Sequence, residues 1–277
     1  MTQLLPNGLE GRGVELVTHF ASREPAVFSA AEAAQLLALS PLRAYDLLSR
    51  LVKRGWLVRH RNGVFEVAPL WASPTAPYAP ERFAALAGWL KDPYYVGFLS
   101  ALELRGWIGH PVLNRVWIAV PGSRHPLRSS VDRITWVVLL PDRFAWGLAK
   151  HWIGERALMI SDPERTILDC VHLARHAGGI TEVARALAHS WPDLDPNRLI
   201  AYVDRLGIEA VRRRLGLLPE TVPLKGGRDV AREIGRGARY RTPVLLDPSL
   251  PIGGEVDRRW GVRLNVELAE IEGAGQT

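Results

Sequence analysis

Residues 27–67 read VFSAAEAAQLLALSPLRAYDLLSRLVKRGWLVRHRNGVFEV, and their pattern decides the fold of the N-terminal part of the chain. Ser29 predicts the start of a short helix, because Glu32 follows at the three-residue spacing of a capping box. After a tight turn, Ser40 as N-cap and Pro41 at the first helical position predict a longer second helix. Proline fits there because its missing N–H would have no partner inside the helix.

The segment after the second helix predicts a β-hairpin. Residues 56–59 and 64–67 are rich in β-branched and aromatic side chains, and Asn62-Gly63 between them is a strong signal for a tight turn. A first helix is expected within residues 9–22, where apolar side chains recur at helical spacing. Helices followed by a two-stranded wing are the layout of a winged helix-turn-helix domain.

The second helix, expected over 41–54, and the hairpin are strongly basic. Residues 43–61 hold six lysines and arginines against one acid, Asp46. Arg43 and Arg50 lie off the apolar stripe of the helix, so we expect them to reach base edges or phosphates in a DNA major groove. A basic face that binds another protein is the alternative interpretation. The predicted DNA-binding residues are Ser40, Arg43, Arg50, Lys53, Arg59, Arg61 and Asn62.

The composition is that of an ordinary globular protein with a basic balance. The chain has 277 residues, a formal net charge of +6 and a pI of about 9.8, which suits a polyanionic partner. Its one cysteine excludes an internal disulfide. We find no charged-then-apolar leader and no apolar run near the roughly 20 residues that a membrane helix needs, so we expect a cytoplasmic protein.

The organisation along the chain predicts an α+β protein of two domains. We expect a winged helix-turn-helix domain over 1–70, a proline-rich linker over 71–80 and a larger mixed α+β domain over 81–277. The prolines around the linker favour extended backbone. In the C-terminal domain we expect helices over 82–90 and 94–105, strands over 115–120 and 134–140, two strands within 144–160 that turn at Gly154, helices over 161–177, 181–190, 196–206 and 208–215, and a terminal strand in 260–268.

Catalytic and metal-binding patterns are weak. Gly122-Ser123 with Asp132 has the spacing of a nucleotidyltransferase motif, but the second carboxylate that would hold Mg²⁺ is replaced by Ile134. Cys170 has too few ligand-type neighbours for a structural zinc site. Neither HExxH nor GxSxG occurs. We therefore expect no enzyme activity, no metal and no cofactor.

The helix expected over 161–177 begins SDPERTILDC, with Ser161 and Glu164 at capping-box spacing. Arg165 and Asp169 stand four residues apart and can pair. The preferred interpretation is an N-terminal cap plus a surface ion pair, rather than a catalytic cluster with Asp162.

Several segments together resemble the AbiEi-type antitoxins of bacterial type IV toxin–antitoxin systems, which act in abortive infection and phage defence. These segments are the winged helix, the proline-rich linker, YYVGFLSALELRGW at 94–107, SDPERTILDCV at 161–171 and GGITEVARAL at 178–187. The resemblance covers roughly 27–265. RLGLLPE at 214–220 and DRRWGVRLNV at 257–266 also resemble the family, although they are less distinctive.

The resemblance implies a DNA-binding protein that represses its own operon and counters a nucleotidyltransferase-like toxin, without needing a stable complex with it. It implies binding to inverted or direct repeats upstream of that operon, and we expect monomers on adjacent repeats to bind cooperatively. It assigns recognition to Arg43 and Arg50 and wing contacts to Arg59 and Arg61. The predicted antitoxicity or partner surface is Asp162, Arg165, Asp169, Arg212, Arg213 and Arg214.

Two other classes of function stay open on the sequence. One is a winged-helix regulator whose C-terminal domain binds a small effector in a pocket among the tryptophans. The other is an enzyme tethered to nucleic acid by the winged helix. Residues 205–241, with ten basic residues against four acids, suit DNA, a structured RNA or an acidic protein equally well.

Overall fold

The computed structural model shows a mixed α+β protein. By their contacts the residues form two compact units, one of residues 1–94 with 126–132 and 150–158, the other of residues 95–125, 133–149 and 159–277. The predicted linker at 71–80 and most of the predicted helix at 82–90 lie outside the described residues. The structure describes residues 9–23, 26–61, 63–68, 83, 86, 90, 93–109, 115–122, 134–153, 156–236, 238 and 242–275.

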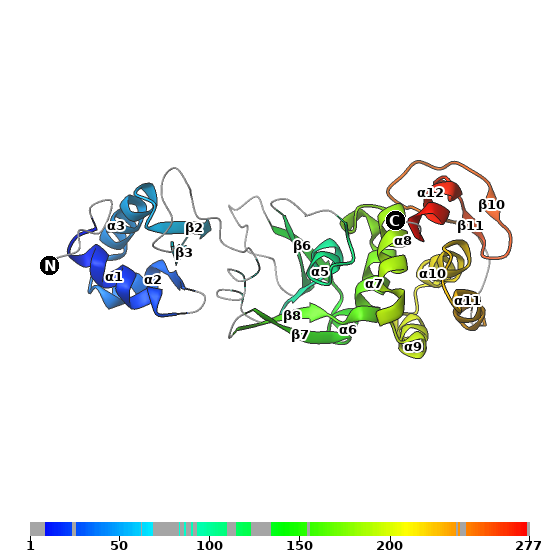
Figure 1. Cartoon of the computed structure of the whole chain (residues 1–277), viewed down its shortest axis with the longest axis horizontal. Coiled ribbons are helices and arrows are strands. Elements are labelled where there is room, and N and C mark those ends of the chain that lie inside the picture. The colour runs from blue at the N-terminus through cyan, green and yellow to red at the C-terminus, as the bar shows by residue number, and fades with distance from the viewer. Residues whose placement is uncertain are drawn as a thin grey trace. The chain divides into compact units, whose positions relative to one another are not determined.

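The N-terminal unit contains the winged helix-turn-helix that the sequence predicts (Figure 1). Both caps are confirmed, since Ser29 forms a full capping box with Glu32 and Ser40 caps the next helix. The sheet has the order β1-β3-β2 and is antiparallel throughout. Its elements are α1 (Arg12–Ala21), β1 (Val27–Ser29), α2 (Ala30–Leu36), α3 (Pro41–Lys53), β2 (Leu57–Arg61) and β3 (Val64–Val67).

Strand β1 was not predicted, because three residues are too few to show an alternating pattern. Its partner defines it: Phe28 stands opposite Phe65 in the ladder with β3. The ring of Phe28 also stacks on that of Phe20 from α1, with centroids 4.0 Å apart. The small core of this unit therefore joins the first helix to the sheet.

The turn between α2 and α3 is a Schellman motif built without glycine. Leu39 N–H donates to Ala34 O at 2.9 Å and Ala38 N–H donates to Gln35 O at 3.3 Å. Ala38 takes the left-handed position, with φ of 47°. The motif ends α2 sharply and lets Ser40 begin α3 two residues later.

A five-stranded sheet of order β6-β5-β4-β8-β7 follows the winged helix in the chain. Strand β4 pairs antiparallel with β5 and parallel with β8, and β5 is parallel to β6. The strands predicted at 115–120, at 134–140 and within 144–160 are confirmed. The helix predicted over 94–105 is wrong at its start, where the chain is extended. The elements are β4 (Tyr95–Val96), α5 (Phe98–Leu104), β5 (Val116–Pro121), β6 (Ile134–Leu139), α6 (Pro141–Phe144), β7 (Leu148–Ile153) and β8 (Arg156–Ser161).

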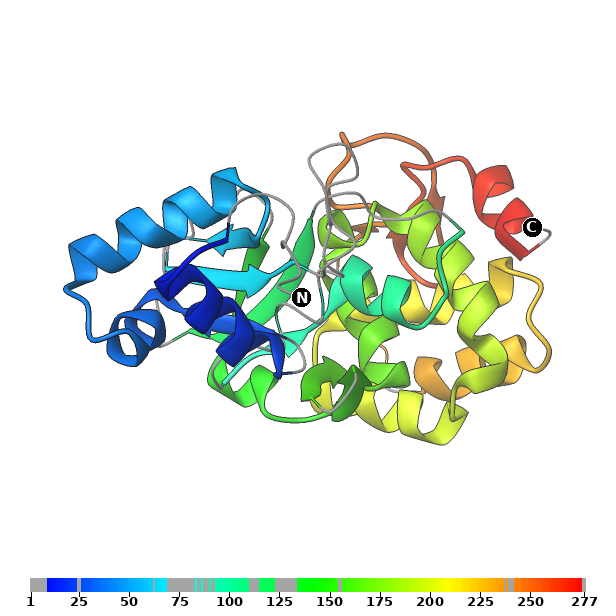
Figure 2. The ribbon, with the colours of Figure 1, turned by 60° about the vertical axis from the view of Figure 1, so that its left-hand side comes forward.

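A group of helices follows the sheet in the chain, green to orange in Figure 2. The helix predicted over 161–177 ends early, because Leu173 leaves helical geometry with φ of −126° and ψ of 61°. Helix α10 continues past its predicted end at 215, and α11 was not predicted. The elements are α7 (Pro163–His172), α8 (Ile180–Ser190), α9 (Pro196–Leu206), α10 (Glu209–Thr221) and α11 (Gly227–Gly235).

The C-terminal segment forms short pieces instead of the predicted long strand in 260–268. Only two residues of it pair, in a small sheet of order β10-β11-β9. Strand β10 is antiparallel to β11, which is parallel to β9. The pieces are β9 (Val244–Leu245), β10 (Val256–Asp257), β11 (Val262–Arg263) and α12 (Leu268–Glu272).

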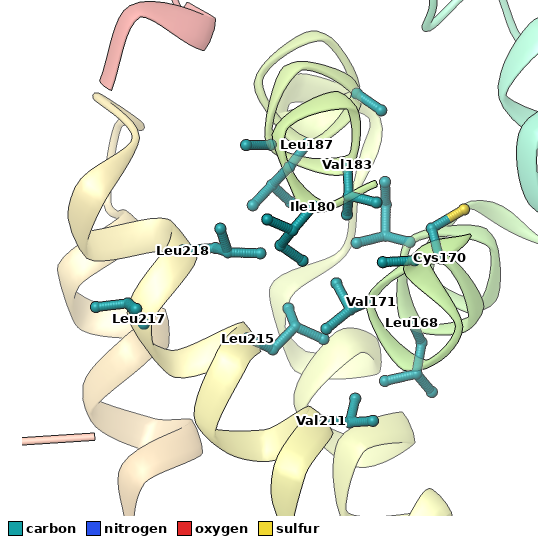
Figure 3. Close-up of a cluster of buried hydrophobic side chains, with 14 of the residues drawn as sticks. Leu168, Cys170, Val171, Ile180, Val183, Leu187, Val211, Leu215, Leu217 and Leu218 are labelled. Carbon is teal, nitrogen blue, oxygen red and sulfur yellow. The ribbon is translucent and has the colours of Figure 1, made fainter. Parts of the chain in front are cut away.

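The helices of the second unit share one apolar core. Figure 3 shows side chains of α7, α8 and α10 converging, with Val171, Ile180, Val183, Leu215 and Leu218 among them. All five of these side chains are buried. Among the described residues, no helix is both long and apolar enough to cross a membrane.

Candidate DNA-binding surface

Helix α3 has one buried face and one exposed face. Ala44, Leu48 and Leu51 face the core of the winged helix. Because an α-helix repeats every 3.6 residues, the side chains opposite them face solvent. The exposed side chains from Leu42 to the end of the helix are Leu42, Arg43, Asp46, Ser49, Arg50 and Lys53.

The basic residues predicted on α3 are available to a partner. Arg43, Arg50 and Lys53 are exposed, and none of them forms an ion pair with another described residue. Three cations on one exposed helix face, with Asp46 between them, attract a polyanion. The local sequence produces this face, because the apolar positions of α3 repeat at helical spacing and leave the arginines outside.

Ser40 holds the beginning of α3. Its hydroxyl accepts the N–H of Arg43 at 3.4 Å, which is long for a hydrogen bond. Pro41 follows as the first helical residue. Ser40, predicted as a DNA-binding residue, is thus a capping residue in the structure, and it lies at the helix end whose free N–H groups and positive dipole favour a phosphate.

The wing is a bulged hairpin. The register of β2 against β3 shifts between Arg59 and Arg61. Arg59 is exposed, while the side chain of Arg61 and all of Asn62 lie outside the described part of the structure. At the tip, Gly63 has φ of 78°, and a Cβ there would come within 3.3 Å of the Tyr45 hydroxyl. The wing tip therefore lies close to α3, and a side chain at position 63 would crowd Tyr45.

Sequence reasoning missed a side-chain contact between the two strands of the wing. His60 Nε2 lies 2.7 Å from Glu66 Oε2, and their side chains are only 13% and 6% exposed. The pair joins β2 to β3 across the sheet. Neither residue belongs to a motif, and only the alternation of the strands could have indicated that they face each other.

The C-terminal residues predicted as an antitoxicity surface are mostly interior. The expected surface pair of Arg165 and Asp169 is wrong, because both side chains are buried, at 0% and 3% exposed. Ser161 is not the N-cap of α7, because its hydroxyl shares a hydrogen bond with Thr166 instead. Asp162 caps the helix by accepting Arg165 N–H at 2.8 Å. These polar residues are used to build the fold.

The three arginines on α10 also differ from the expectation. Arg213 and Arg214 are buried, at 3% and 6% exposed. Arg213 donates to Thr242 O at 2.6 Å, and Arg214 donates to Leu245 O at 2.8 Å. Arg212 donates to the side chain of Asp204 at 2.6 Å. Arg213 and Arg214 hold the segment with Thr242 and Leu245 onto α10, whereas Arg212 joins α10 to α9, and the three do not form an exposed basic patch.

Groups suited to metal binding do not gather in the described residues. No group of three or more His, Cys, Asp or Glu side chains there is arranged to hold a metal ion. Ser123 and Asp132 lie outside the described residues, and Gly122 directly follows β5. Cys170 is buried, and burial raises the pKa of its thiol well above the usual value.

Comparison with known proteins supplies a family for the winged helix. Residues 15–68 match the model of a family described as "Transcriptional regulator, AbiEi antitoxin". The winged helix is of the AbiEi antitoxin type. The match spans α1 to the end of β3 and so includes the exposed face of α3 and the wing.

The whole fold of the chain has a counterpart among solved structures. The crystal structure of the RV2827C protein from Mycobacterium tuberculosis superposes with a TM-score of 0.68 and covers 93% of this chain and 94% of that one. Sequence identity is 16%, so the likeness concerns the fold alone. No curated protein matches the chain significantly.

Proposed function

We propose that this AbiEi-type chain is a DNA-binding antitoxin that represses its own bacterial type IV toxin–antitoxin operon. In this proposal its winged helix binds operator DNA, and its C-terminal domain counters a nucleotidyltransferase-like toxin without catalysis of its own. The observation that carries the DNA-binding part is the exposed face of α3, where Arg43, Arg50 and Lys53 have no ion-pair partner among the described residues.

The binding mechanism follows from this geometry. Helix α3 enters the major groove, its exposed face reads base edges, and the wing lies along the phosphates. Each phosphate that a cation neutralises releases counterions, so affinity falls steeply with salt. Monomers on adjacent repeats then bind cooperatively.

The test of repression is a titration of the full chain with its upstream DNA over a series of salt concentrations. The variant is the pair Arg43→Ala/Arg50→Ala, and the matched control is Arg232→Ala/Arg236→Ala, which removes two exposed arginines from α11 and its C-terminal end. We expect selective binding that the variant loses by at least about tenfold, with a salt slope lower by about two units. Equal, weak binding to any DNA by all three proteins would refute a repressor.

The antitoxin part needs a separate test. With the toxin gene and this chain expressed from unrelated promoters, the chain should restore growth. Arg43→Ala/Arg50→Ala should restore it equally, because repression is then bypassed. A toxin that stays lethal in the presence of the folded wild-type chain would contradict the antitoxin role. The proposed role as a transcriptional regulator would be unaffected.

A regulator with a small effector has less support. A cavity of about 560 Å³ lies around the connection of α10 to α11. None of its described lining residues is a tryptophan, so it differs from the pocket among tryptophans that a small-effector regulator would need. Its lining includes Pro219, Glu220, Leu224, Gly226, Arg228 and Arg232.

A further inference from the structure

One large apolar side chain is exposed on the basic face of α3. Leu42 is 74% exposed, although it is the second residue of a helix whose other leucines are buried or half-buried. Leucine on a helix normally lies toward the core, because its burial is favourable by about 1.5–3 kcal/mol. Single exposed apolar side chains are common on protein surfaces, so the significance of Leu42 rests on its place in the proposed DNA-binding face.

The position of Leu42 follows from helical geometry. Leu42, Asp46, Ser49 and Lys53 recur at i, i+4, i+7 and i+11 and form one row along the helix. This row lies opposite the buried side chains and so forms the middle of the exposed face. Leu42 occupies its N-terminal end, and N-terminal residues of a recognition helix are the ones that contact base edges.

We propose that Leu42 reads the 5-methyl group of a thymine in the major groove, a specificity contact that rests on the proposed operator binding. Thymine is the base that presents an apolar group there, and apolar side chains are its usual partners. Arg43 and Arg50 flank the row and hold the helix to phosphates and polar base edges. Leu42 then discriminates a base pair that presents a methyl group in the major groove from base pairs that do not.

The surroundings of Leu42 favour DNA over a protein partner. All the exposed side chains that follow it on α3 are polar or charged: Arg43, Asp46, Ser49, Arg50 and Lys53. Apolar surfaces that bind proteins are contiguous patches of several hundred Å², which one leucine does not provide. A face with three cations and one acid complements a polyanion with an apolar methyl in its groove.

The experiment replaces thymine by deoxyuridine, one position at a time, in the DNA that the full chain binds. Uracil lacks only the methyl group, so wild-type affinity should fall about fourfold at one position of each site, the value of burying one CH₂-sized group. Leu42→Ala should bind thymine-containing DNA about fourfold or more weakly and show no thymine–uracil difference at that position. Its circular dichroism should match the wild type, because alanine is a good helix former.

Two controls separate this contact from general effects. Arg43→Ala should lower the affinity but keep the thymine–uracil difference. Ile252→Ala removes an apolar side chain that is 80% exposed outside the winged helix, and it should behave as the wild type.

The outcomes distinguish the two proposals. Wild-type protein without sequence-selective binding would defeat operator binding itself. Selective binding with no sensitive thymine, or with a thymine–uracil difference that persists in Leu42→Ala, would overturn the role of Leu42 and leave operator binding intact. Leu42→Ala that alters self-association or toxin rescue, with unchanged base discrimination, would also overturn it, in favour of a protein contact.

Discussion

The guanidinium of Arg165 donates from Nε to Oδ1 of Asp169 at 2.7 Å, one turn along α7, inside the C-terminal unit. The remaining groups of the pair are satisfied as well. Tyr95 OH donates to the other carboxylate oxygen at 2.7 Å, and Arg165 Nη1 donates to Trp146 O at 3.0 Å. The pair thus joins strand β4, the residues before β7 and helix α7 at one point.

Removing either charge should strongly destabilise this unit. We expect Asp169→Ala and Arg165→Ala each to lower the free energy of unfolding by about 3–5 kcal/mol, because the remaining partner is left as an uncompensated buried charge. The measurement is urea unfolding followed by tryptophan fluorescence.

The control is the exposed pair of Arg232 and Asp229 on α11, whose side chains are 65% and 74% exposed. Breaking it with Asp229→Ala should cost less than about 1 kcal/mol, as for surface pairs in general. Equal costs at both sites would mean that the pair of Arg165 and Asp169 is not a structural centre of the fold.

The winged helix could be read from the sequence because its signals are local. Ser29 and Glu32 are three residues apart, and Ser40 directly precedes its helix. The environment of Arg165 could not be read in this way. Tyr95, which decides whether Asp169 is satisfied in the interior, lies 74 residues away in the chain. The i,i+4 spacing alone fits a surface pair equally well.

Contacts between residues distant in the chain also explain why the arginines of α10 were wrongly predicted to form a surface. The run Arg212-Arg213-Arg214 on its own indicates a solvated basic face. Arg213 and Arg214 are instead buried because backbone carbonyls of Thr242 and Leu245 accept their hydrogen bonds. No local pattern reports that a segment about 30 residues later returns to cover the helix. On α3, by contrast, the apolar stripe was sufficient to place Arg43 and Arg50 outside.

Glycine in place of Ala38 should stabilise the turn between α2 and α3. Ala38 has φ of 47°, a conformation that costs a residue with a Cβ about 1 kcal/mol. Ala38→Gly should therefore raise the free energy of unfolding of the winged helix by about 0.5–1 kcal/mol, although glycine usually destabilises. Thermal unfolding measured by circular dichroism checks the sign. Ala31→Gly, on the exposed side of α2, should lower stability by about 1 kcal/mol, and a loss in both variants would contradict the Schellman turn.

The role of Ser40 as a helix cap can be tested separately from its proposed contact with DNA. Ser40→Ala should cost about 0.5 kcal/mol, less than the ~1 kcal/mol for Ser29→Ala, because the bond of Ser40 is 3.4 Å long while Ser29 and Glu32 cap each other. Ser40→Asp should keep the stability, because aspartate caps well, but should weaken DNA binding by repelling phosphates. Chemical unfolding and the DNA titration test the two effects. Unchanged DNA affinity of Ser40→Asp would place Ser40 away from the phosphates.

His172, the last residue of α7, should lower the free energy of unfolding as the pH falls below neutrality. Burial, with the nearby charges of Arg143, Arg214 and Arg165, lowers the pKa of His172 to about 4 from 6.5. The folded state therefore binds fewer protons than the unfolded state between these values, so stability is lost as the pH falls from about 6.5 to 4 and is unaffected above. His176 adds a loss of the same sign, because burial and Arg175 lower its pKa too.

We expect the His172 contribution to be about 1–2 kcal/mol, since partial exposure reduces the effect of the full shift. Urea unfolding of the wild type and of His172→Leu, each at pH 7.5 and pH 5, measures it. The variant should lose less stability between the two values than the wild type does, whatever its absolute stability. His189→Leu, at an exposed position of α8, serves as the control and should retain the wild-type difference. A His172→Leu protein as acid-sensitive as the wild type would show that His172 takes up its proton without opposing the fold.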